Sequence, residues 1–220
     1  MPPAPDQPLT AARTLAIECT TEACSVALFE GAQLLAGEFR HLGRGHAEAL
    51  VPMIAALPDR GQATRIAVGL GPGSFTGVRI GLAAARALAL AWQAQCVGYP
   101  TLALIAAMAR AQTDQDEVLV ATTGGHGEWF VQGFDANDTT LPLASLRPDA
   151  AAALPQAIVA GSQAEALVTR RGSGHALPLW PDARAVMTLP QRAFTPDLSP
   201  IYGRAPDARL PGGLLPGSQA

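Results

Sequence analysis

The residues best suited to chemistry form a glycine-rich stretch, GLGPGSFTG, at positions 69–77. Backbone amides in such a loop, where a helix begins, can hold the oxygens of a phosphate. A P-loop also needs a lysine, and this chain has none, because all 15 of its positive residues are arginine. The dinucleotide-binding pattern fails because Ser74 stands where its third glycine belongs. The serine-hydrolase elbow fails because Pro72 and Thr76 replace its two glycines. An anion held by bare amides stays open as an alternative.

Histidines and cysteines offer no metal site. The four histidines have no ligand spacing among themselves or with a cysteine or carboxylate; they are His41, His46, His126 and His175. The three cysteines lie within apolar runs, and we expect reduced, buried thiols at Cys19, Cys24 and Cys96. His46, together with Glu48, is expected to order the start of a helix.

The glycine-rich stretch also contains a second pattern. Small residues recur at intervals of four, at Gly73, Gly77, Gly81, Ala85 and Ala89, and this spacing places them on nearly one line along a helix. Each glycine inside a helix costs about 0.5 to 1 kcal/mol relative to alanine, so such a stripe needs close packing in return. Another element of the same lobe or a second polypeptide could pack there. The spacing alone leaves both possibilities open.

Length and composition describe an ordinary globular protein. The chain has 220 residues, of which 49% are hydrophobic, enough for one large domain or two lobes. Its formal charge is −3 and its arginines are scattered, so nucleic-acid binding by this chain alone is not expected. No membrane span or signal segment is evident, and we expect a cytoplasmic location.

The apolar patterns predict two related α/β lobes. In the first half, three close strands should form an antiparallel meander; they are expected at residues 14–20, 24–31 and 32–41. A helix over 46–57, a strand over 64–71, a helix over about 75–92 and a strand from 95 should follow, with Thr101 capping a further helix.

A smaller version of the same pattern follows. Residues 117–135 predict two strands joined by a glycine-rich turn, and residues 157–171 predict a strand and a short helix. From Pro178 onward the recurring prolines indicate irregular structure.

Four stretches together resemble the TsaB (also called YeaZ) family. They are TLAIECTTEACSVALFE, RGHAEALVPMI, GPGSFTGVRIGLAAARALA and LSPIYGRAPDAR. This family is the dimerisation subunit of the bacterial machinery that makes threonylcarbamoyladenosine at position 37 of tRNAs. The resemblance implies an α/β, two-lobed actin/Hsp70/sugar-kinase-like (ASKHA) fold. We expect an N-terminal lobe over 13–110, a smaller C-terminal lobe over 111–203 and a flexible tail over 204–220.

The same resemblance implies a role in protein association. It implies pairing with the catalytic subunit TsaD through helices of the N-terminal lobe, joint work with the ATPase TsaE, and a homodimer when the chain is alone. No cofactor and no direct tRNA binding are expected here, with ATP on the partner subunits. It also favours a partner over internal packing for the small-residue stripe, so the expected interface comprises Gly73, Ser74, Phe75, Thr76, Gly77, Arg79, Gly81, Ala85 and Ala89.

The chain departs from the family pattern at several positions. Glu18 stands where an aspartate is usual. In ATTGGHGEWF, over 121–130, Thr123 and Gly125 occupy the acidic and basic positions of the usual Asp-Ala-Arg-x-Gly-Glu-Val-Tyr run. Leu50 stands four residues after His46, where the catalytic relative has its second metal-binding histidine. The altered hairpin sequence puts a function of the hairpin in doubt, but not the fold.

A non-catalytic scaffold is therefore expected. The alternative is an autonomous nucleotide-binding enzyme of the sugar-kinase type, but the turn ECTTEACS contains no glycine to approach a phosphate. A glycoprotease is disfavoured, because the chain has neither a His-Glu-x-x-His motif nor a convincing nucleophile.

Overall fold

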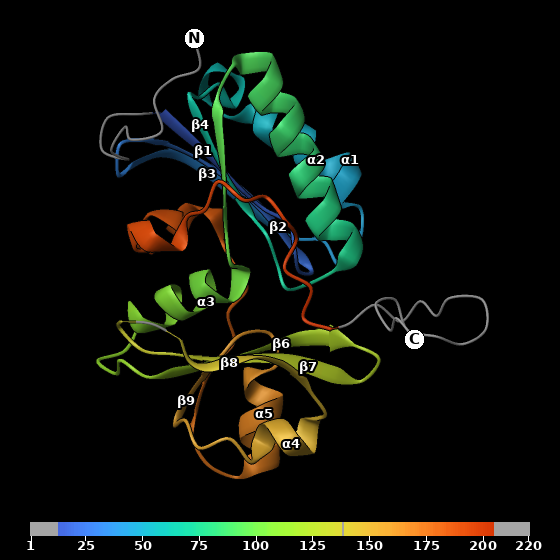
Figure 1. Ribbon diagram of the computed structural model, residues 1–220, viewed down its shortest axis with the longest axis vertical. Coiled ribbons are helices and arrows are strands. Elements are labelled where there is room, and N and C mark those ends of the chain that lie inside the picture. Colours follow the sequence, from blue (N-terminus) through green and yellow to red (C-terminus); the bar gives the residue numbers. More distant parts are fainter. Residues whose placement is uncertain (1–12, 138, 205–220) are drawn as a thin grey trace, which may run out of the picture.

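Two five-stranded sheets organise the chain into two lobes (Figure 1). The computed structural model describes residues 13–137 and 139–204. The sheet of the first lobe has the strand order β3-β2-β1-β4-β5. Its strands are β1 (Arg13–Glu18), β2 (Ala23–Glu30), β3 (Gln33–His41), β4 (Arg65–Gly69) and β5 (Gln95–Tyr99). The first three pair antiparallel, as predicted, whereas β4 and β5 run parallel to β1.

Two helices cover one face of this sheet, α1 (His46–Ala56) and α2 (Phe75–Trp92) (Figure 1). Their bounds agree closely with the predicted ranges. Leu50, Met53 and Ile54 recur at the spacing of one helix face and are buried against the sheet. By length and composition alone α2 could cross a membrane, but one face of it packs on β4 within this lobe.

The second lobe repeats the strand order of the first, as β8-β7-β6-β9-β10 read from the equivalent edge. Its strands are β6 (Val118–Gly125), β7 (Glu128–Phe134), β8 (Thr139–Leu146), β9 (Ile158–Ala160) and β10 (His175–Leu177). Again three strands form an antiparallel meander, and the last two run parallel to its first strand. The helices α4 (Pro148–Ala152) and α5 (Ala164–Arg171) cover its outer face (Figure 1). The prediction of two related lobes is therefore confirmed.

Helix α3 (Thr101–Arg110) lies between the two sheets (Figure 1). Leu104 and Ala107 pack with residues of the first sheet, whereas Leu102, Ile105 and Ala109 pack with residues of the second. Because one helix serves both cores, the division of the chain at residue 110 stays a prediction. The expected flexible tail, apart from Arg204, lies outside the described residues.

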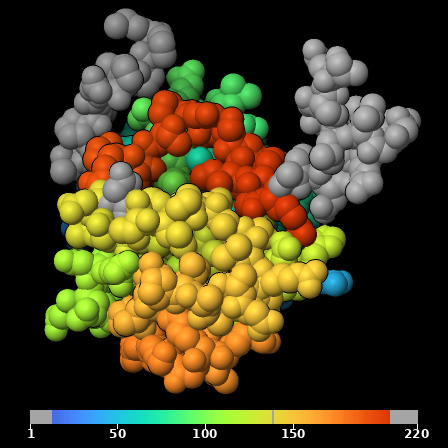
Figure 2. All heavy atoms as spheres, turned by 60° about the horizontal axis from the view of Figure 1, so that its bottom comes forward, coloured from blue at the N-terminus to red at the C-terminus, as the bar shows by residue number. Residues whose placement is uncertain are grey.

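After the second lobe the chain returns to the first. The 3-10 helices η2 (Ala183–Thr188) and η3 (Gln191–Ala193) lie on the face of the first sheet opposite α1 and α2, where Ala183, Val186 and Leu189 are buried. The space-filling view shows the last described segment, in red, along the boundary between the lobes (Figure 2).

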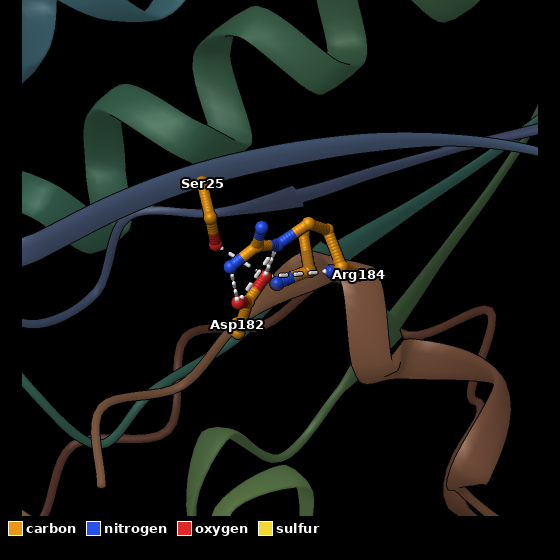
Figure 3. Close-up of polar contacts among 4 residues, drawn as sticks. Ser25, Asp182 and Arg184 are labelled. Carbon is orange, nitrogen blue, oxygen red and sulfur yellow. Dashed lines mark hydrogen bonds and ion pairs between the residues drawn. The ribbon is translucent and has the colours of Figure 1, made fainter. Parts of the chain in front are cut away.

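A polar clamp holds this returning segment in place. The Asp182 carboxylate accepts hydrogen bonds from the Arg184 guanidinium and from its own helix, and the Ala183 amide donates to Ser25 Oγ at 2.8 Å (Figure 3). The aliphatic stem of Arg184 lies close to Gly37 on β3, where a side chain would overlap it. The sequence did not predict this return, although it did predict irregular structure here.

Candidate partner interface and the glycine-rich loop

The glycine-rich loop connects β4 to α2 and is held by the turn between β1 and β2. Ser74 caps the helix, because its hydroxyl accepts a hydrogen bond from the Gly77 amide at 3.3 Å. The Ser74 amide itself donates to the Thr20 carbonyl at 2.6 Å. The Gly71 amide donates to the Thr101 hydroxyl at 3.2 Å. Three of the amides that could have received an anion, those of Gly71, Ser74 and Gly77, are thus engaged within the chain.

The small-residue stripe faces this turn, and the expected partner interface is wrong at its centre. Gly77, Gly81 and Ala85 are buried within the first lobe. A Cβ atom at Gly73 or Gly77 would overlap the backbone carbonyl of Thr20 or Cys19, and one at Gly81 would lie 2.9 Å from Cys19 Sγ. Cys19 Sγ also donates to the Gly77 carbonyl at 3.3 Å. The close packing that the glycines require is therefore supplied by a strand-to-strand turn of the same lobe.

Beneath the turn lies a buried polar network centred on Glu18, at the end of β1. Its carboxyl group accepts hydrogen bonds from the Thr20 amide at 2.9 Å, the Thr20 hydroxyl at 2.6 Å and the Thr101 hydroxyl at 3.2 Å. The prediction that Thr101 caps α3 is therefore wrong. Thr101 is the first residue of the helix, and its hydroxyl belongs to this network. The Tyr99 hydroxyl donates to the Ile17 carbonyl at 3.1 Å.

Burial determines the protonation of these groups. Desolvation raises the pKa of Glu18 from 4.5 to about 7, and the hydrogen bonds from Thr20 and Thr101 only partly oppose it. Desolvation also raises the pKa of Cys19 well above its ordinary value and that of Cys24 to about 11. Both thiols are therefore protonated near neutral pH. Cys19 and Cys24 are buried as expected, whereas Cys96 is only half-buried.

His46 is a structural residue. Its ring is buried at the start of α1, and Nε2 donates to the Thr21 carbonyl at 2.8 Å. Over the described residues, no group of three or more histidine, cysteine, aspartate and glutamate side chains could hold a metal ion.

The outer face of α2 presents the rest of the expected interface. Ser74, Phe75, Thr76 and Arg79 are exposed at its start, whereas Ala89 is half-buried. The exposed face continues along the helix through further residues that the prediction omitted, namely Ala83, Arg86, Ala87, Leu90 and Ala91. Leu90 is 83% exposed and Phe75 is 54% exposed. The face carries two arginines and no acidic residue.

A cavity of about 730 Å³ opens between the lobes at the start of this helix. Phe75 and Arg79 form part of its wall together with Val78. Its other walls come from the β6–β7 hairpin and the last described residues, including Thr123, Gly124, Gly125, His126, Phe130, Ile201, Tyr202, Gly203 and Arg204. The altered hairpin and the glycine-rich loop are thus brought to one site.

Sequence reasoning did not find the role of Tyr202 and Arg204 in this cavity. The Tyr202 ring lies 5.9 Å from that of Phe75, centroid to centroid, and Tyr202 is 49% exposed. The signal was present in the segment LSPIYGRAPDAR, which places one aromatic residue and two arginines in a stretch with recurring prolines. Its place beside α2 depends on contacts distant in the sequence.

Comparison with known proteins supports the resemblance. A family model described as TsaD, tRNA N6-adenosine threonylcarbamoyltransferase, matches residues 40–172. The tRNA threonylcarbamoyladenosine biosynthesis protein TsaB of Escherichia coli K12 is 39% identical over 123 residues, which cover 54% of this chain and 53% of the relative. The protein of the same name from Haemophilus influenzae is 44% identical over 84 residues, covering 34% of each chain. The chain thus spans about half the length of the first of these relatives.

Solved structures extend the similarity over both lobes. YeaZ from Pseudomonas aeruginosa has a TM-score of 0.72 and 27% identity, covering 87% of this chain and 99% of its own. A second P. aeruginosa structure, described as an uncharacterized protein with similarity to peptidase YEAZ, gives the same TM-score and identity. The two-lobed actin/Hsp70/sugar-kinase-like fold expected from the sequence is confirmed.

Proposed function

Because the chain belongs to the family of the TsaD model, and within it to the TsaB (YeaZ) members, we propose that it is a non-catalytic subunit of tRNA threonylcarbamoyladenosine biosynthesis. In this proposal it pairs with a TsaD-type catalytic subunit and acts with a TsaE-type ATPase. The complex transfers a threonylcarbamoyl group to adenosine 37 of tRNA. Its place of action is the cytoplasm, where tRNA is modified.

The occupied turn after β1 supports a role without catalysis. A nucleotide phosphate in this fold would need free amides after β1, but Thr20 and Glu18 occupy that space and bond to each other. The carboxyl group of Glu18 would also repel a phosphate when ionised. We therefore propose that ATP binds to the partner subunits and that this chain needs no cofactor.

The outer face of α2 is the observation that carries the proposal of a subunit interface. It presents Ala83, Ala87 and Leu90 to solvent in a row, with Leu90 83% exposed. Val51 on the neighbouring α1 is 62% exposed. Exposed apolar residues gathered on one face are typical of a protein–protein interface, and arginine is enriched there as well. We propose that TsaD packs on this face and that two copies of the chain use it when no TsaD is present.

A charge placed on this face should prevent association. Leu90→Glu is expected to weaken binding to the TsaD-type subunit at least about 100-fold, because it would bury an unpaired carboxylate in an apolar interface. Isothermal titration calorimetry with the purified subunits measures this change, and sedimentation velocity reports the homodimer. Leu34→Glu is the matched control, because Leu34 is an exposed leucine (43%) on β3, away from α2.

The proposal fails if Leu90→Glu binds TsaD as tightly as the unmodified chain. Circular dichroism of the variant must match that of the control, so that lost binding is not lost folding. An autonomous nucleotide-binding enzyme is tested separately. In that case the isolated chain would release or absorb heat when titrated with ATP and magnesium, whereas the subunit proposal expects none.

A further inference from the structure

Arg79 in the interlobe cavity is a cation whose guanidinium group has no hydrogen-bond partner among the residues that the structure describes. Its guanidinium carbon lies 3.5 Å from the centre of the Phe75 ring. Stacking of this kind uses the flat face of the guanidinium group and leaves its N–H groups free at the edge. No carboxylate among the described residues lies within ion-pair distance of Arg79. The side chain is exposed but held in place by the aromatic ring.

Arg204 supplies a second cation on the opposite wall. Its Nη1 atom lies 3.7 Å from Glu128 Oε2, at the long end of an ion pair. The same oxygen of Glu128 accepts a shorter hydrogen bond, of 2.6 Å, from the Ser145 hydroxyl. Arg204 is therefore only loosely engaged, and a better-placed carboxylate could compete for it.

Arg204 lies beside the altered hairpin. A Cβ atom at Gly125 would lie 3.9 Å from Arg204 Nη2, so the guanidinium group lies next to the backbone of this turn.

The other residues that line the cavity indicate what kind of group could bind to these arginines. The rings of Phe75 and Tyr202 are each about half exposed, and with Val78 and Ile201 they form an apolar wall. Glu22 is the one carboxylate among the described residues that line the cavity, and it lies on the β1–β2 turn. Arg79 has no carboxylate partner among the described residues and Arg204 has only the long contact with Glu128, so the two arginines favour an anion, and the apolar wall favours an aliphatic or aromatic side chain beside it.

We propose that the interlobe cavity receives an acidic segment of the partner subunit, whose carboxylate binds Arg79 and Arg204 while a neighbouring apolar side chain packs on Phe75 and Tyr202. This inference rests on the proposed function, because the segment belongs to the subunit that packs on α2. The cavity is continuous with the outer face of that helix, since Phe75 and Arg79 belong to both. A partner on the helix can therefore reach the cavity without leaving its interface.

The test measures binding of the TsaD-type subunit to the full chain by calorimetry. Arg79→Ala and Arg204→Ala are each expected to weaken binding about tenfold, and the double variant about 100-fold. The double variant should also lose part of the dependence of the binding constant on NaCl concentration. Arg79→Lys should restore only part of the affinity, because lysine keeps the charge but not the planar donors. Arg147→Ala, an exposed arginine at the start of α4, should bind normally.

The partner's carboxylate is then located by changing its aspartates and glutamates to the corresponding amides one at a time. One of these changes should be non-additive with Arg79→Ala in a double-mutant cycle. Normal binding by Arg79→Ala/Arg204→Ala, or additivity for every acidic residue, overturns the proposal of the cavity. If Leu90→Glu still abolishes binding in that case, the proposed subunit role stands without it. If neither variant affects binding, both proposals are overturned.

Discussion

Glu18 shows how a single side chain closes a site that its fold would leave open. The carboxyl group lies at the end of β1, fully buried, and its hydrogen-bond donors are two threonines from different elements. A short, polar residue facing solvent there could help to hold a ligand. Glu18 is instead buried, and its hydrogen bonds to Thr20 and Thr101 join the β1–β2 turn to the start of α3.

The pKa of Glu18 makes the stability of the protein dependent on pH. Burial raises this pKa from 4.5 to about 7, so the folded state binds the proton more tightly than the unfolded chain does. The stabilisation is complete below pH 4.5 and is lost as pH rises through about 7. The loss amounts to roughly 3 kcal/mol, at 1.36 kcal/mol for each pKa unit.

Glu18→Gln should remove this dependence, because an amide keeps hydrogen bonds to the threonines and does not ionise. Urea unfolding between pH 4.5 and 8.5 measures the free energy of unfolding of both proteins. The unmodified chain should lose stability relative to the variant as pH rises. Glu30→Gln, at an exposed glutamate on β2, serves as the control. Parallel curves for the unmodified chain and Glu18→Gln would show that burial does not raise the pKa of Glu18.

At the scale of elements, the packing of α2 is determined by its glycines. Alanine normally stabilises a helix by about 1 kcal/mol relative to glycine. Gly77→Ala should do the opposite and destabilise the protein by roughly 1–3 kcal/mol, because its Cβ would overlap the Cys19 carbonyl. Chemical denaturation measures the effect.

The control for this variant lies on the other side of the same helix. Ala83→Leu adds more volume than Gly77→Ala but points to solvent, so the stability of the isolated chain should change by less than about 0.5 kcal/mol. A Gly77→Ala protein that is more stable than the parent chain would show that the turn can move away from the helix.

The bounds of the helices and strands could be predicted from the sequence better than the elements that pack against them. The bounds of α1 and α2 follow from apolar spacing, from Pro58 after the first helix and from the glycine-rich stretch before the second. The stripe from Gly73 to Gly81 correctly indicated a close approach of backbone to backbone. It could not indicate what approaches, because a strand-to-strand turn and a partner helix make the same demand for small residues. Phe75 and Arg79, which lie between the residues of that stripe, are exposed, and their place in a partner interface stays a prediction.

At the scale of the whole molecule, the first lobe depends on a segment that follows the second. Val186 on η2 is fully buried against the first sheet, with Phe29 and Tyr99 in the same cluster. Such a contact joins residues more than 80 positions apart in the sequence, and no local sequence pattern predicts it. The cavity beside Tyr202 and Arg204 could not be predicted for the same reason.

A charge on the returning segment should open the first lobe. Val186→Asp would bury an unpaired carboxylate and should cost several kcal/mol. Hydrogen exchange followed by mass spectrometry should show faster exchange in β1 and β2, with β6 and β7 less affected. Thr188→Asp is the matched control, because Thr188 is exposed on the same 3-10 helix. Equal exchange in the two variants would mean that the segment contributes little to the first sheet.

The return of the chain to its first lobe also bears on synthesis at the ribosome. The apolar surface formed by Ala16, Ala27 and Ala67 gains its final cover only when residues 183–189 have been translated. The N-terminal lobe, although made first, must wait for residues 183–189 to emerge before it is complete. During that interval the nascent chain exposes one side of a sheet, and this side is where a molecular chaperone would bind.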